Sequence, residues 1–221
     1  MIWRWIRAHR SVAATVASGV AIVAVVATLA IVSTGYTTQK LTLGDGAVWV
    51  PNSQNQVIGR ANPAVLELNT VVRSKGTQLG VVQSGSTVLM VDRADATVSI
   101  VDPATSTAGQ PIALPPQQPQ VFLAGDRIAI YEGGTGRLWL VSADQLPSFD
   151  ATGPATLSLG ARAVISVAPD GTLIAYSPQT GRVYQVDAAT SDVVADRWST
   201  DLGNGSSYQT TSVGGQWAVL D

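Results

Sequence analysis

Residues 87–102 decide the fold of this chain: they read Thr87-Val-Leu-Met-Val-Asp92, then a polar turn, then Thr97-Val-Ser-Ile-Val-Asp102. Each half is a short run rich in Val, Ile and Leu that ends in an aspartate, which is typical of a β-strand. The four polar or small residues between the halves predict a hairpin. Residues 127–141 repeat this arrangement, as do residues 172–187 and 45–58.

The repeat has a regular period. Taking Val57, Val98, Leu138 and Val183 as equivalent positions, the intervals are 41, 40 and 45 residues. A period of about 40–45 residues built from short strands is typical of β-propeller blades, each of which is a four-stranded antiparallel sheet. Since the region shows no sustained helical period, we expect an all-β, propeller-like fold of about four blades, as a complete small ring or part of a larger one.

Turn residues support the hairpins. Gly136 and Gly181 can take the positive φ of tight hairpin turns, and Asn55 and Asp95 tolerate it better than most residues. Asp45, Asp126 and Asp170 stand at the turns that lead into a repeat and suit turn capping. Proline-rich joints at 114–116, 147 and 153–154 are expected between repeats.

The last residues suggest an interrupted repeat. Residues 215–221 align with 86–92, the first strand of a hairpin, and no partner strand follows. Because an unpaired strand exposes backbone groups, we expect this sequence to be the N-terminal piece of a longer chain. The alternative is closure of the ring by pairing of this strand with the first blade.

A long apolar segment precedes the repeats. Residues 12–32 consist of Ala, Val, Ile and Leu with four small polar or glycine residues, and as a helix they would extend roughly 31 Å, enough for a hydrocarbon core of about 30 Å. We therefore expect a cytoplasmic stub at 1–11, a transmembrane helix at 12–34 and an extracytoplasmic domain at 35–221, truncated at its C-terminal end. A cleaved signal peptide, cut near residues 33–35, is the alternative.

Basic and aromatic flanks orient this helix. Three arginines flank its N-terminal end and only Lys40 lies near the other end, so the positive-inside rule places the N-terminus in the cytoplasm of a single-pass membrane protein. Aromatic residues stand where interfacial belts form. The orienting residues are Arg4, Arg7, Arg10, Trp3, Trp5 and Tyr36. Ala13, Ala17 and Ala21 form a small-residue stripe that could support weak homodimerisation, although alanine is common throughout the segment.

Composition excludes several kinds of chemistry. The only histidine, His9, precedes the helix, and the chain has no cysteine, so the exterior lacks the residues for Ser-His-Asp triads, Cys-His dyads and ordinary zinc sites. All 15 acidic residues lie beyond the helix, against 10 of the 13 basic ones, and a mildly acidic exterior argues against nucleic acid as a partner. We assign no catalytic residue, cofactor or metal ligand.

Two stretches look like sites and are better explained as turns. Residues 132–137, Glu-Gly-Gly-Thr-Gly-Arg, resemble a phosphate loop, but they lie between two strands and lack the following lysine and helix. Residues 92–95 offer two carboxylates without the spacing of a calcium loop. Trp49, Trp139 and Tyr184 could form an aromatic platform for a ligand such as a sugar, but packing between blades is the commoner use of such residues.

The segment 98–115 resembles blades of the YVTN and quinoprotein-like propellers, with a strand, an Asp-Pro-x-Thr turn and another strand. The whole chain resembles the N-terminal region of large actinobacterial membrane-anchored surface proteins, in which a propeller-like head precedes fibronectin type III or Ig-like repeats. Stretches 33–36, 45–50, 59–69 and 211–220 carry that similarity. It implies a role at the cell surface with no catalytic residues, although this sequence contains no fibronectin-like repeat.

These observations favour a non-enzymatic, membrane-anchored cell-surface protein whose propeller head is a binding or structural scaffold for a surface protein or glycan, displaying fibronectin-like modules in a longer chain. The alternative is a quinoprotein-like or hydrolytic propeller enzyme whose site is completed by further sequence. A third hypothesis, a sensor that signals through the helix, has little support because the cytoplasmic stub is too short for a domain.

Overall fold

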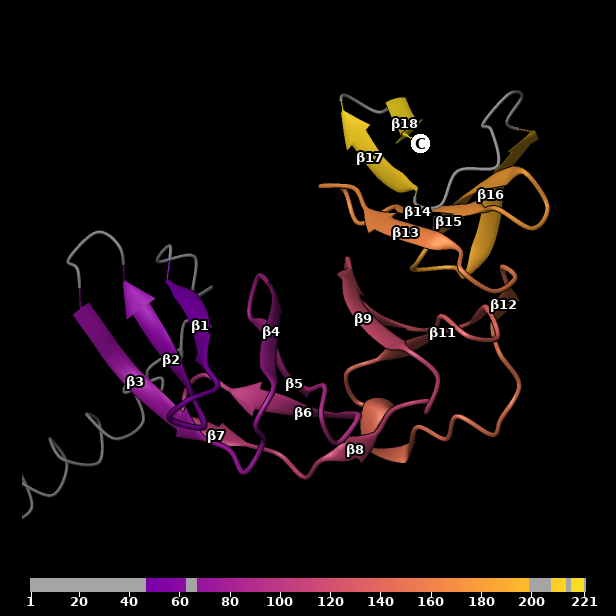
Figure 1. The fold of residues 1–221 in the computed structure, drawn as a ribbon. Coiled ribbons are helices and arrows are strands. Elements are labelled where there is room, and N and C mark those ends of the chain that lie inside the picture. Colours follow the sequence, from indigo (N-terminus) through magenta and orange to yellow (C-terminus); the bar gives the residue numbers. More distant parts are fainter. Residues whose placement is uncertain (1–46, 63–66, 199–207, 214–215, 221) are drawn as a thin grey trace, which may run out of the picture. The chain divides into compact units, whose positions relative to one another are not determined.

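The computed structural model describes residues 47–62, 67–198, 208–213 and 216–220, and all structural statements below concern these residues (Figure 1). Contacts divide the chain into residues 1–41 and 42–221, and every described residue belongs to the second unit. The predicted helix at 12–34 and its flanking residues lie outside the described part. Within that part, no helix is long and apolar enough to cross a membrane.

The described chain is all-β, which confirms that part of the prediction, and it forms five antiparallel sheets where about four blades were expected. Sheet 1 has the order β1 (Val48–Asn52), β2 (Val57–Asn62), β3 (Glu67–Arg73). Sheet 2 has the order β4 (Leu79–Ser84), β5 (Thr87–Asp92), β6 (Thr97–Asp102), β7 (Thr107–Ala108), and β8 (Ile112–Ala113) also pairs with β6.

The remaining sheets follow the same plan. Sheet 3 has the order β12 (Leu157–Ser158), β11 (Arg137–Ser142), β10 (Arg127–Glu132), β9 (Pro119–Ala124). Sheet 4 has the order β13 (Val164–Val167), β14 (Leu173–Ser177), β15 (Arg182–Asp187), β16 (Asp192–Trp198). Sheet 5 is the pair β17 (Gln209–Val213) and β18 (Gln216–Leu220), and a short 3₁₀ helix, η1 (Leu146–Ser148), lies between β11 and β12.

The hairpin that defines the repeat has one geometry throughout. In β1–β2, β5–β6, β10–β11 and β14–β15, four residues connect the strands, and the fourth has a positive φ. That residue is Gln56, Ala96, Gly136 or Gly181, with φ of 54°, 47°, 78° and 64°. Gly136 and Gly181 were predicted correctly. Asn55 and Asp95 were wrong by one position, because the turn requires the left-handed residue immediately before the second strand.

The same turn corrects the alignment of the first repeat. The second residue of the strand after the turn is Ile58, Val98, Leu138 or Val183, and all four are buried. Ile58, and not Val57, is therefore the equivalent position, and the intervals become 40, 40 and 45 residues. Val57 pairs with the last residue of β1 and is only half-buried.

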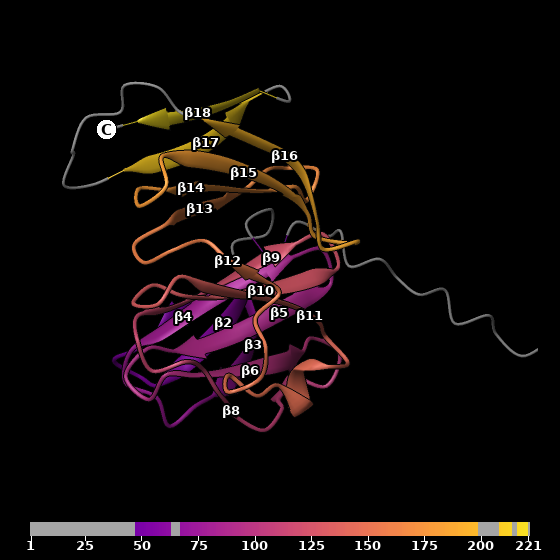
Figure 2. The same ribbon diagram turned by 90° about the vertical axis from the view of Figure 1, so that its right-hand side faces the viewer.

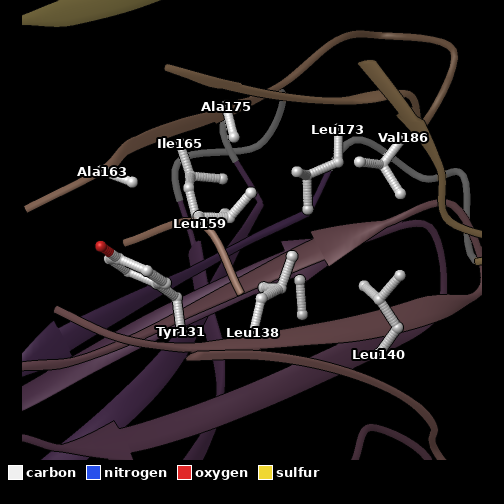
Figure 3. Close-up of a cluster of buried hydrophobic side chains, with 10 residues drawn as sticks. Tyr131, Leu138, Leu140, Leu159, Ala163, Ile165, Leu173, Ala175 and Val186 are labelled. Atoms are coloured by element: carbon white, nitrogen blue, oxygen red, sulfur yellow. The ribbon is translucent and has the colours of Figure 1, made fainter. Parts of the chain in front are cut away.

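Consecutive sheets lie against one another (Figure 2), and clusters of buried apolar side chains fill the spaces between them. Between sheets 3 and 4, Leu138 and Leu140 of β11 meet Leu173 and Val186 of β14 and β15 (Figure 3). Equivalent positions have the same role elsewhere, since Ile58, Val98 and Val183 each lie in the core shared with the following sheet. A row of antiparallel sheets that bury equivalent positions against each neighbour is the packing of propeller blades, and sheets 3 and 4 have the four strands of a complete blade.

The face of sheet 1 that points away from sheet 2 is exposed. Val48 and Val50 on β1 are 47% and 49% exposed, and Val71 on β3 is 45% exposed. The residues that correspond to Val50 in sheets 2 and 3 are Met90 and Ile130, which are 7% and 0% exposed because the preceding sheet covers them. Within the described residues, no sheet covers this face of sheet 1.

Two sequence interpretations need correction. Pro147 and Pro154 do not join repeats, because both lie in the connection between β11 and β12 of one sheet; only the joint at 114–116 connects two sheets. The strand at 216–220 has a partner, since β18 pairs along its length with β17. It is therefore the second strand of its sheet and is not isolated.

Candidate functional site

The three aromatic residues predicted as a platform do not come together. Trp49 lies in the core between sheets 1 and 2, Trp139 in the core between sheets 2 and 3, and Tyr184 packs on the core between sheets 3 and 4. Trp49 and Trp139 are 5% and 4% exposed. These positions agree with packing between blades, the use that the sequence favoured.

The most connected polar cluster lies at the turn between β10 and β11. The Glu132 carboxylate is 1% exposed, and it accepts hydrogen bonds from the Thr135 hydroxyl and from Nε and Nη2 of Arg137 at 3.2 and 2.9 Å. The guanidinium of Arg137 also lies 4.8 Å from the centre of the Trp139 ring. Residues 132–137 therefore form a hairpin turn whose polar side chains bond to one another, and they are not a phosphate loop.

Hydrogen bonding holds Glu132 in its charged form. Burial by itself raises the pKa of the Glu132 carboxyl, but hydrogen bonds from Thr135, Arg137 and the Gln117 N–H, together with the Arg137 charge, outweigh it and hold the pKa below the ordinary value. Gly136 fits beneath this turn only because it lacks a side chain, since a Cβ there would overlap the backbone of Gly160.

The equivalent positions in sheet 2 carry smaller side chains. Glu132 pairs with Arg137 in its hairpin, and Asp92 pairs with Thr97 in the same register. The counterpart of Trp139 is Ser99. Three large side chains, with Arg137 in contact with both of the others, are thus replaced by three smaller ones.

A groove of about 550 Å³ lies where those small side chains stand. Its buried side is formed by Met90, Asp92, Thr97 and Ser99 of β5 and β6. Its rims come from the end of β3 with the following loop, residues 73–76, and from the connection 108–111 that leads from β7 to β8. The groove therefore has the volume of a site for a small ligand or a side chain of a larger one.

Two buried polar groups line this groove. Asp92 is 7% exposed; its Oδ1 accepts a hydrogen bond of 3.0 Å from the Ala94 N–H, and its carboxylate occupies the space that a Cβ on Gly76 would fill. Ser99 is 3% exposed, and it carries a hydroxyl that can donate or accept a hydrogen bond. The carboxylate and the hydroxyl can therefore form hydrogen bonds to a ligand in the groove.

The rims add opposite charges. Arg73 and Lys75 line one side and Asp95 lies at the turn, so that the groove carries two cations and two carboxylates including Asp92. No ion pair joins any of these four side chains within the part of the chain that the structure describes. In the same part, no group of three or more histidine, cysteine or acidic side chains could hold a metal ion.

A second hollow of about 320 Å³ lies between β4 and β9. Valine, phenylalanine and proline residues form most of its lining, and Arg93 is its only charged residue. Since it offers neither a buried polar side chain nor a carboxylate, it is a weaker candidate than the groove of sheet 2.

Sequence reasoning did not find the groove. It treated residues 92–95 as a solvated turn and did not single out Thr97 or Ser99. Alignment of Asp92, Thr97 and Ser99 with Glu132, Arg137 and Trp139 would have shown the loss of side-chain volume. That the lost volume stays open depends on the neighbouring sheet, which a single sequence does not give.

No family model matches this chain, and no curated protein matches it. Solved structures with a similar fold include hydrazine synthase of Kuenenia stuttgartiensis, at 19% identity over 69% of this chain and 46% of that chain, with a TM-score of 0.47. They also include virginiamycin B lyase from Staphylococcus aureus, at 14% identity over 72% of this chain and 54% of that chain, with a TM-score of 0.47. This chain thus spans about half the length of the structures that it resembles.

Proposed function

We propose that this chain is part of a non-enzymatic, membrane-anchored surface protein of the actinobacterial type described above, whose propeller-like head binds a polar ligand in the groove of sheet 2. The groove carries the proposal, because it combines a buried carboxylate, a buried hydroxyl and charges of both signs in one hollow. The apolar segment at 12–32 and its flanking arginines support anchoring with the head outside the cell.

The chemistry of the described carboxylates supports binding. The two buried ones, Asp92 and Glu132, accept hydrogen bonds from their own turns. A general acid or base needs a pKa near the working pH, whereas the pKa of Glu132 is held below its ordinary value. A hollow in the face between two sheets also resembles the protected sites at which rigid scaffolds hold ligands.

Membrane topology and groove occupancy test the proposal separately. In right-side-out vesicles containing the full chain, added protease should degrade the head, while a tag on the N-terminus stays protected. In the same preparation, Ser99→Trp should fill the groove and remove binding to whichever member of a glycan and charged-peptide array the wild type retains. A head protected from protease would refute the anchored arrangement, and binding unaffected by Ser99→Trp would refute the groove as the site.

An enzyme is the competing function. Purified full-length chain should show neither cofactor absorbance nor turnover of glycan or lactone substrates. Turnover that disappears in Asp92→Asn would overturn the non-enzymatic assignment and make Asp92 a catalytic residue.

A further inference from the structure

The polar cluster of sheet 3 indicates what the groove of sheet 2 lacks. In sheet 3, the Arg137 guanidinium lies between the Glu132 carboxylate and the Trp139 ring. At the repeat position of Arg137, sheet 2 has Thr97, and no other cationic side chain lies within ion-pair distance of Asp92 among the described residues. The carboxylate is retained and its cation is missing.

We infer that the groove binds an arginine-like ligand, whose guanidinium takes the place against Asp92 that Arg137 occupies against Glu132. This inference rests on the groove being the ligand site proposed above. A buried carboxylate without a counter-charge is costly, and a guanidinium supplies a cation and parallel N–H donors together. The Ser99 hydroxyl lines the same groove and can accept a further N–H.

The floor of the groove suits the rest of such a ligand. Met90 lies beside Asp92 on β5, facing the groove, and offers an adaptable apolar surface for an alkyl stem. The small Thr97 and Ser99 leave the volume that Arg137 and Trp139 occupy in sheet 3. The hydrophobic stem of an arginine can thus be buried while its charged end reaches the carboxylate.

The rim determines what else the ligand carries. Arg73 and Lys75 line the groove and would repel a ligand that is only cationic. A carboxylate close to the guanidinium would satisfy them. The ligand class is therefore an arginine that bears or adjoins a carboxylate, as in free arginine, a C-terminal arginine or an arginine beside an acidic residue in a peptide.

Three small molecules separate these contributions. L-arginine carries both groups, agmatine carries the guanidinium without a carboxylate, and citrulline carries the carboxylate with an uncharged urea. In equilibrium dialysis of the full chain in mild detergent, labelled L-arginine should bind saturably and agmatine should compete at least tenfold less well. Citrulline should not compete; competition by citrulline equal to that of unlabelled arginine would overturn the guanidinium assignment.

Two variants test the position. Asp92→Asn should weaken arginine binding at least tenfold, because it removes the negative charge that makes the hydrogen bonds to the guanidinium charge-assisted. Thr97→Arg should abolish binding by supplying the guanidinium internally, while leaving the chain at least as heat-stable as wild type. Asp102→Asn is the matched control, since Asp102 ends a strand and caps the Ala104 N–H in the same way but does not line the groove.

The outcomes distinguish this inference from the proposed function. Wild-type chain that binds no arginine but retains an array ligand lost in Ser99→Trp would leave the groove a binding site and overturn the ligand class. Arginine binding that persists in Thr97→Arg would overturn the position, even if Asp92→Asn fails to fold.

Discussion

Substitution of Glu132 by glutamine should cost about 2 kcal/mol of unfolding free energy at neutral pH. The glutamine keeps the size and one acceptor oxygen, but it loses the charge that Arg137 faces at 2.9 Å and presents an amide donor where only donors surround it. Breaking a fully buried ion pair costs about 3–5 kcal/mol. Because the Arg137 side chain is 37% exposed, solvent screens part of this loss, and the smaller figure is expected.

The same substitution should change the pH dependence. Since the folded-state pKa of Glu132 lies below its ordinary value, the carboxylate stabilises the fold fully above that ordinary value of 4.5 and loses this contribution as pH falls through the folded pKa. The difference between wild type and Glu132→Gln should therefore be greatest at neutral pH and shrink in acid.

Urea unfolding of the full chain in mild detergent, followed by tryptophan fluorescence across this pH range, measures the difference. Asp102→Asn is a control, because hydrogen bonds from Thr105 and Ala104 lower the Asp102 pKa but this side chain is exposed. It should change stability less than Glu132→Gln. A Glu132→Gln difference that is negligible at neutral pH, or that grows in acid, would show that this carboxylate does not stabilise the turn.

Three further substitutions test the packing and the turns. Ile130→Ala should cost about 2–4 kcal/mol in urea unfolding, whereas Val50→Ala at the equivalent but exposed position should cost little; equal losses would mean that the face of sheet 1 is covered. Gly136→Ala should destabilise by about 2–4 kcal/mol through backbone strain and overlap, and Gly125→Ala, with open space around it, by about 1–2 kcal/mol from strain alone; thermal melts should rank them in that order. Gln83→Ala should cost about 1–2 kcal/mol, because the Gln83 side-chain amide accepts a hydrogen bond from the Trp49 N–H and donates one to the Ala47 carbonyl. Faster amide hydrogen exchange confined to β1 would support this role.

Local chemistry was sufficient to predict the hairpins. Short runs rich in Val, Ile and Leu, together with the turns at Gly136 and Gly181, placed β5, β6, β10, β11 and β15 within a residue of their observed bounds. The first repeat was misaligned because Gln56 is an unusual residue for a left-handed conformation, so the turn signal pointed to Asn55 instead. Residue preference favours Asn55 for the positive φ, but the strand register decides that Gln56 takes it.

The candidate site was not predicted, for a different physical reason. Asp92 and Glu132 stand at the same position of the repeat, and both sequences read as capped turns. Two later positions decide whether the interface is filled or forms a groove. The residue five positions after the carboxylate is Arg137 in sheet 3 and Thr97 in sheet 2, and the residue seven positions after it is Trp139 or Ser99. Those differences have meaning only once the sheets are known to stack.

The shared hairpin geometry has a consequence for how such chains acquire new properties. The backbone hydrogen bonds of the turn and ladder do not involve the side chains at the positions of Thr97 and Ser99, so codon changes there remodel one interface and leave the others untouched. Substitutions can therefore change each interface between sheets separately. A loss of side-chain volume at one interface leaves a groove where packed side chains would otherwise lie. In such an architecture new recognition can arise by removing atoms from a repeat, without the insertion of a loop.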